Sequence, residues 1–175
     1  IEMAPDQASG YYSRGMSYVD LGDEVRARRD FDAAIALTPN YGSALYQRGL
    51  IAHRARNFRE AVNYFNRVEP AGDFTWLNFY RGSAYREMGE LDLALRDAQS
   101  GTHENADESA YAWLLASVLN ARRDYAAAAI AARRIAELTP NDALAFNMLG
   151  NQLFFSGDHA GALSAYERAI ALDGD

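Results

Sequence analysis

Apolar and small residues recur along the chain three and four positions apart, which is the spacing of one face of an α-helix. Five segments carry such a set at i, i+4 and i+7, and their middle residues are Gly15, Gly49, Gly82, Ala116 and Gly150. A second helical segment follows each of them, and its middle residues are Phe31, Phe65, Ala98, Ala132 and Tyr166. The pattern predicts an all-α fold of five antiparallel helix pairs.

The five pairs repeat with a nearly constant period, because their first middle residues lie 34, 33, 34 and 34 positions apart. Turn-forming residues follow seven positions later in every copy, at Gly22, Arg56, Gly89, Arg123 and Gly157. The period divides the chain into a leader and five repeats that form one continuous domain, with the boundaries 1–7, 8–41, 42–74, 75–108, 109–142 and 143–175. Residues 100–107 predict an irregular end to the third repeat, with a frayed helix end followed by a loop.

These residues resemble the tetratricopeptide repeat family, whose unit of 34 residues has an aromatic residue, Leu-Gly and Tyr, and later Ala, an aromatic residue and Pro. Five copies that agree in period, helix faces and turns carry the resemblance over nearly the whole chain. It implies a right-handed α-solenoid whose first helices line a concave groove and whose second helices lie on the convex side. The glycines at the middle positions are expected at close helix crossings.

Arginine precedes the middle residue of the first helix in three copies, at Arg14, Arg48 and Arg81. In antiparallel packing, the facing positions of the second helices hold Asp30, Tyr64 and Asp97. We therefore expect ion pairs between Arg14 and Asp30 and between Arg81 and Asp97. The last two copies have leucine at the first position and alanine at the second, and the expected contacts there are Leu115 with Ala131 and Leu149 with Ala165.

A second series on the first helices lies one position along from the packing face. It predicts a partner-binding surface made of Tyr12, Met16, Tyr46, Leu50, His53, Phe79, Arg86, Trp113, Asn120, Asn147 and Asn151. Aromatic rings offer contact area at low entropic cost and amides fix register, so the expected ligand is a peptide segment or helix of another protein. The alternative is that the rings pack between neighbouring repeats and are structural.

Composition narrows the function further. The net charge of −7 disfavours nucleic acid, because a phosphate backbone would be repelled. The chain has no lysine and no cysteine, which excludes Schiff-base, P-loop and thiolate chemistry. It also lacks the Lys and Asn clamp with which some tetratricopeptide domains bind chaperone tails. The three histidines lie in different repeats, so no metal site and no cofactor are expected.

The longest purely apolar run, residues 126–132, is far too short to span a membrane. We therefore predict a non-catalytic protein-interaction scaffold with no membrane span in these residues. Two alternatives stay open: a regulatory or targeting arm of a larger enzyme or assembly, and a subunit that self-associates through its C-terminal helix, which no polar helix caps.

The chain begins at Ile1 and is expected to be a piece of a longer protein. Arginine as the sole strong base hints at a bacterial source, in cytoplasm or periplasm.

Overall fold

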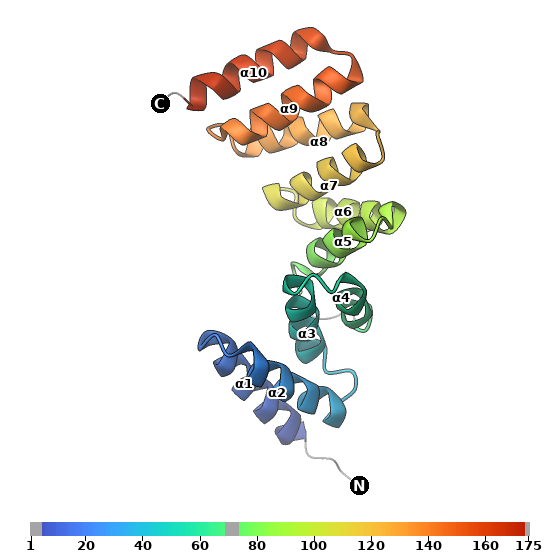
Figure 1. Cartoon of the computed structure of the whole chain (residues 1–175), viewed down its shortest axis with the longest axis vertical. Helices are drawn as coiled ribbons and strands as arrows, with labels where there is room; N and C mark the ends of the chain where they lie inside the picture. The colour runs from blue at the N-terminus through green and yellow to red at the C-terminus, as the bar shows by residue number, and fades with distance from the viewer. Residues whose placement is uncertain (1–4, 69–73, 174–175) are drawn as a thin grey trace. The chain divides into compact units, whose positions relative to one another are not determined.

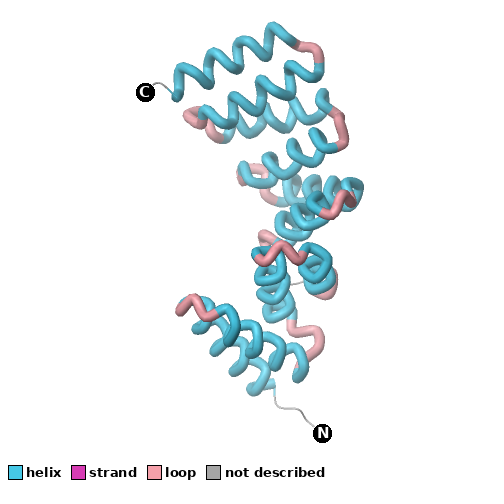
Figure 2. Tube along the Cα trace, viewed as in Figure 1, coloured by secondary structure: helices cyan, strands magenta, loops and turns pink. Residues whose placement is uncertain are grey.

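The computed structural model describes residues 5–68 and 74–173, and these residues are helical apart from short turns and loops (Figure 1, Figure 2). They form ten α-helices, which are α1 (Pro5–Asp20), α2 (Glu24–Leu37), α3 (Gly42–Arg54), α4 (Phe58–Phe65), α5 (Leu77–Glu87), α6 (Leu91–Glu104), α7 (Ser109–Ala121), α8 (Tyr125–Leu138), α9 (Ala143–Ser156) and α10 (His159–Asp173). The all-α architecture of helix pairs expected from the sequence is confirmed.

The chain divides into two compact units, residues 1–88 and 89–175. In the first unit, helices α1 to α4 each pack on the next, and α5 packs on α3 and α4; in the second, helices α6 to α10 each pack on the next. The border between the units lies inside the third predicted repeat, 75–108. Arg81 and Asp97 thus belong to different units, and their pairing stays a prediction. Helix α1 begins at Pro5, three residues before the predicted start of the first repeat, and residues 1–4 of the predicted leader lie outside the described residues.

Rings of the second helices lie directly on glycines of the first helices. A β-carbon added at Gly15 would lie 2.7 Å from the ring of Phe31, and one added at Gly150 would lie 2.6 Å from the ring of Tyr166. The ring of Phe65 covers Gly49 in the same way. Since a side chain at these positions would have to displace a packed ring, the expected close crossings are confirmed for these three glycines.

The third repeat ends differently from the prediction. Residues 100–104 are not frayed but belong to regular helix α6, and only residues 105–108 form a loop. The ring of Tyr111 in α7 lies over Gly101 and is fully buried, so it holds this part of α6 in place. The backbone N–H of Asn105 also donates to the carbonyl of Gly101 at 2.9 Å, which closes the last turn.

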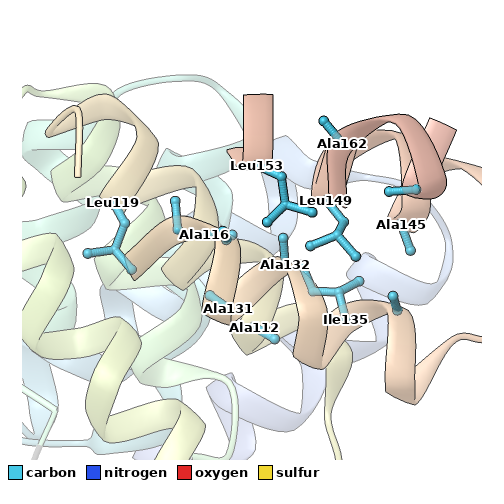
Figure 3. Close-up of a cluster of buried hydrophobic side chains, with 14 residues drawn as sticks. Ala112, Ala116, Leu119, Ala131, Ala132, Ile135, Ala145, Leu149, Leu153 and Ala162 are labelled. Atoms are coloured by element: carbon cyan, nitrogen blue, oxygen red, sulfur yellow. The ribbon is translucent and has the colours of Figure 1, made fainter. Parts of the chain in front are cut away.

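Alanine dominates the core of the second unit. Figure 3 shows Leu149, Leu153 and Ile135 surrounded by the alanines of α7, α8, α9 and α10. Small side chains let the helix backbones approach closely, and the larger aliphatic residues fill the space that remains. Leu149, Ala165 and Ala131 belong to this cluster, and Leu115 packs against it. The four residues of the expected apolar contacts thus lie in or against one core, and the individual pairs stay a prediction.

The turn after each first helix contains one residue with a positive φ angle. Three of these residues are glycines, and the other two are Arg56 at 59° and Arg123 at 62°. Asp23, Asp124 and Asp158 follow three of these residues, and each carboxylate accepts a hydrogen bond from a backbone N–H in the first turn of the next helix. The sequence thus fixes the start of α2, α8 and α10 by side-chain capping.

Candidate interaction surface

Arg14 and Arg48 each join the first helix of a pair to the second. Nε and Nη2 of Arg14 each donate to a carboxylate oxygen of Asp30 at 2.7 Å, so the expected pair forms with two hydrogen bonds. These bonds lower the pKa of the buried Asp30 carboxyl, although burial acts in the opposite direction. Arg48 is buried and donates to the Tyr64 hydroxyl at 3.0 Å, as its facing position predicted. It also donates to Asp32 of α2 at 2.6 Å, a contact to the preceding pair.

The two aromatic residues that begin the predicted surface are packed between repeats. The ring of Tyr12 lies 5.8 Å from the ring of Phe31 in its own helix pair and 5.5 Å from the ring of Tyr41, the N-cap residue of α3 in the next helix pair. Its partial burial raises the pKa of the hydroxyl. The ring of Tyr46 lies 5.2 Å from the ring of Phe74, which comes shortly before α5, the first helix of the next pair. The structural role that was the alternative for these rings is therefore present in both.

The next residues of the series in the first unit are half-buried as well. Met16 packs against the cluster around Phe31, and Leu50 packs against the cluster around Phe65. His53 is half-buried, and its ring lies 5.5 Å from the rings of both Phe58 and Tyr80. Desolvation lowers the pKa of this imidazole. These side chains line the first helices while they brace one repeat against the next.

Phe79 and Arg86 complete the predicted series in the first unit. The ring of Phe79 lies 5.6 Å from Trp76 and 5.4 Å from Tyr80, in edge-to-face contact with both. Arg86 donates to its neighbour Glu87 at 2.5 Å, and its side chain is about one third exposed. The positive charge of Arg86 therefore lies close to a carboxylate, which reduces the electrostatic attraction between Arg86 and an acidic ligand.

The second unit leaves more of the predicted surface open. Trp113 is half-buried against the alanine-rich core, whereas Asn120 on the same face of α7 is exposed. On α9, Asn147 and Asn151 are exposed, and the side chain of Asn151 accepts a hydrogen bond from the Tyr166 hydroxyl at 2.8 Å. Phe154 continues this face at i+7 from Asn147 and is 51% exposed. An apolar ring and several amide groups thus lie on accessible faces of α7 and α9.

Two aromatic residues that matter for this surface were missed from the sequence. Tyr41 and Phe74 lie 33 positions apart, at the ends of the first and second predicted repeats, and they contact Tyr12 and Tyr46. Their spacing matches the repeat period, which is the signal that could have revealed them. The third and fourth predicted repeats end in Glu108 and Asp142 at the corresponding position.

The edge of the helix pairs at the turns carries a further series of contacts that the sequence analysis did not identify. Ion pairs join Glu24 to Arg54, Arg56 to Glu87 and Asp92 to Arg122, each between one repeat and the next. At the following junction the rings of Tyr125 and Phe155 are stacked, with centroids 5.1 Å apart. Phe155 is thus partly exposed, and it also contacts the neighbouring repeat through Tyr125.

Residues 5–68 and 74–173 contain no group of three or more histidine, aspartate or glutamate side chains arranged to hold a metal ion. Within the same residues, every helix is too short or too polar to cross a membrane. His103 and His159 are exposed, on the last turn of α6 and at the start of α10.

Comparison with known proteins places these repeats in context. A family model described as tetratricopeptide repeat matches residues 12–74 and 81–143. Among curated proteins, the human Protein SGT1 homolog is 23% identical over 114 residues, which cover 65% of this chain and 31% of that protein. The chain therefore spans about a third of the length of this relative.

Solved structures of similar fold include MamA, with a TM-score of 0.89 at 16% identity over 98% of this chain and 94% of that one. They include MamA 41-end from Desulfovibrio magneticus RS-1, with a TM-score of 0.86 at 18% identity over 96% of each chain. They also include YrrB, described as a TPR protein with an unusual peptide-binding site, with a TM-score of 0.86 at 19% identity over 94% of this chain and 86% of that one. At these identities the likeness concerns the fold.

Proposed function

Because the chain belongs to the tetratricopeptide repeat family, whose members bind other proteins, we propose that it is an interaction scaffold for a segment of a partner protein. The segment is a peptide or helix that lies across the exposed faces of the first helices. The chain supplies no catalytic group of its own in this proposal, and the partner-binding residues are those of the predicted series.

The observation that carries the proposal is the accessible face of α7 and α9. Asn120, Asn147 and Asn151 are exposed there, and Phe154 and Trp113 place apolar surface beside them. Amides can donate to and accept from a peptide backbone, while the rings supply buried area on binding. In the first unit, Tyr12 and Tyr46 are half-buried and already contact Tyr41 and Phe74, so only part of each ring is accessible to a ligand.

A peptide selected from a random display library against the folded chain provides the test ligand. We expect Trp113→Ala to weaken the affinity for this peptide at least tenfold, since truncation of buried aromatic anchors typically costs about 2 kcal/mol or more. Tyr46→Ala is expected to act in the same direction. Asn120→Ala removes an exposed amide without disturbing the core, and a smaller loss of about threefold is expected from one hydrogen bond.

The control is Arg59→Ala, because Arg59 is exposed on α4, a second helix. Circular dichroism establishes first that each variant is folded, since Trp113 packs against the core and Tyr46 packs against Phe65. If folded Trp113→Ala, Tyr46→Ala and Asn120→Ala all keep the full affinity, the first-helix surface is not the binding site and the proposal is wrong.

A further inference from the structure

The second repeat differs in charge from the rest of the chain. Residues 48–67 contain five arginines and one glutamate, which gives this segment a net charge of +4, whereas the rest of the chain carries −11. A hollow of about 640 Å³ lies beside α4. It is lined by the turn before the helix, by the helix and by a residue after it, namely Arg56, Asn57, Phe58, Arg59, Glu60, Asn63, Tyr64 and Arg67. Positive charge therefore prevails in this hollow.

Two arginines of the hollow have no carboxylate partner among the described residues. The side chain of Arg59 forms no hydrogen bond or ion pair with any of them. Arg67 donates from Nη2 to the backbone carbonyl of Pro39 at 2.9 Å, and this neutral acceptor leaves its charge unbalanced. Both side chains are exposed, and a guanidinium group binds a carboxylate with two parallel hydrogen bonds. The hollow thus offers two anchoring points for anionic groups.

The carboxylate in the lining does not cancel this attraction. An oxygen of Glu60 lies 3.4 Å from Nη2 of Arg48, which is buried beneath the hollow's edge. The charge of Glu60 is therefore already offset by a residue of its own helix pair. Arg56 lies 3.3 Å from a carboxylate oxygen of Glu87, but its side chain is 76% exposed, and such exposed pairs are weak. Arg56 can thus also turn toward an anion in the hollow.

The start of α4 lacks the negative charge that precedes the other second helices. The residue before α4 is Asn57, and the corresponding residues of the other repeats are Asp23, Glu90, Asp124 and Asp158. The Asn57 side chain accepts no hydrogen bond from the backbone of the first turn. Since the first N–H groups of a helix attract negative charge, this end of the hollow adds to the attraction of the arginines.

We propose that the hollow binds an acidic peptide segment of a partner protein. Arg59 and Arg67 lie eight positions apart, which corresponds to about 12 Å along a helix. An extended peptide spans this distance in about four residues, whereas a single carboxylate or phosphate group is much shorter. Between the two arginines, Asn63 offers an amide for the peptide backbone and Tyr64 offers part of a ring. The segment thus carries acidic side chains about four positions apart, with neutral residues between them.

A second copy of the chain is a poorer occupant. An acidic cluster of the chain itself, residues 104–108, contains Glu104, Asp107 and Glu108. It is not extended, because the backbone N–H of Glu108 donates to the carbonyl of Asn105 at 3.0 Å and closes a turn. Asp107 also lies 3.3 Å from Arg134. In addition, the net charge of −7 makes two copies repel each other.

The probe for the test is the acetylated and amidated peptide Ala-Glu-Glu-Ser-Leu-Ser-Glu-Glu-Ala. It is titrated into the isotopically labelled full chain and followed by amide NMR. We expect shifts at Asn57, Arg59 and Asn63. The same peptide with glutamine in place of every glutamate should cause none. The affinity should fall when the salt concentration is raised from about 20 mM to about 150 mM, because exposed ion pairs are screened.

Three variants locate the site. Arg59→Glu should weaken binding roughly tenfold or more, since it turns an attraction into a repulsion. Asn57→Asp should weaken it about threefold without lowering the midpoint of thermal unfolding, because aspartate is a good residue at a helix start. Arg133→Glu is the matched control, because Arg133 is exposed on α8, outside the hollow, and undergoes the same change of charge. It should stay within about twofold.

The proposal goes beyond the first-helix surface and shares no residue with it, so the two can fail independently. It is overturned if the probe causes no shifts along residues 56–67, if the glutamine peptide binds equally well, or if Arg59→Glu and Arg133→Glu weaken binding equally. Inorganic phosphate that causes the same shifts at the same concentration would show a site for small anions only. Vesicles with 30% phosphatidylserine that retain the wild type but not Arg59→Glu would make a membrane surface the occupant. A dimer that Arg59→Glu disrupts, seen by sedimentation without the probe, would make it a second copy. Each of these three results would also overturn the proposal.

Discussion

At the scale of single residues, the sequence predicted those contacts that depend only on the repeat period. The glycines at positions 15, 49 and 150 meet their rings, and Arg14 meets Asp30, because facing positions in an antiparallel pair follow from the spacing alone. The contacts of Tyr41, Phe74 and Tyr111 could not be predicted in this way. They join one helix pair to the next, so they depend on how the helices cross and on the volume that each side chain must fill.

The pair formed by Arg14 and Asp30 gives a prediction about coupling. Arg14→Ala and Asp30→Ala should each destabilise the fold, because each change leaves the other charge without its two hydrogen bonds. The double variant should cost less than the sum of the single variants. Urea unfolding of the four proteins measures the coupling, and strict additivity would show that the two side chains do not stabilise each other.

The same pair predicts a pH dependence with a definite sign. Because Arg14 lowers the pKa of Asp30 in the folded chain, the stability due to this carboxylate is complete above its ordinary pKa of 3.8 and is lost as the pH falls through the lower folded value. The excess stability of the wild type over Asp30→Asn should therefore shrink below about pH 4. An excess that is unchanged at pH 3 would contradict this.

At the scale of helices and turns, the sequence predicted the five turns but not their conformation. Each turn places one residue at positive φ, and glycine supplies it in three of them. The pattern Arg-Asn or Arg-Asp in the other two marks a turn by position only, since arginine has no preference for this region. Regular helix to the end of α6 was likewise hidden, because Tyr111 stabilises that end from a different repeat.

Arg123 offers a direct test of turn strain. A non-glycine residue in the left-handed region destabilises the folded chain by roughly 1–2 kcal/mol, which glycine avoids. Glycine also increases the entropy of the unfolded chain, and this offsets about 0.4–1 kcal/mol of the gain. Arg123→Gly should therefore stabilise the protein by about 0.5–1 kcal/mol in urea unfolding. Arg123→Ala is the control for loss of the side chain and should be close to neutral, because it keeps a β-carbon at φ 62°. Equal effects of the two variants would rule out backbone strain as the cause.

At the scale of the whole molecule, stability is organised through neighbouring helices. Within each unit, a helix packs on those adjacent to it in the chain, and α5 reaches one helix further to α3. In repeat proteins of this kind, stability is approximately a sum over repeats and the interfaces between them. Truncation of a core side chain should thus lower the local stability of the helices around it more strongly than that of distant helices.

Phe31 and Ile135 allow this to be tested in a reciprocal way, because each is fully buried, the first under Gly15 in the first unit and the second in the alanine-rich core of the second. Phe31→Ala should cost about 3–5 kcal/mol and Ile135→Ala about 2–5 kcal/mol. Native-state hydrogen exchange should show loss of protection in α1 to α3 for Phe31→Ala, with α8 to α10 little changed, and the opposite distribution for Ile135→Ala. If either variant lowers protection equally in all helices, the chain unfolds as one cooperative block. Its stability would then depend on interactions that extend well beyond neighbouring repeats.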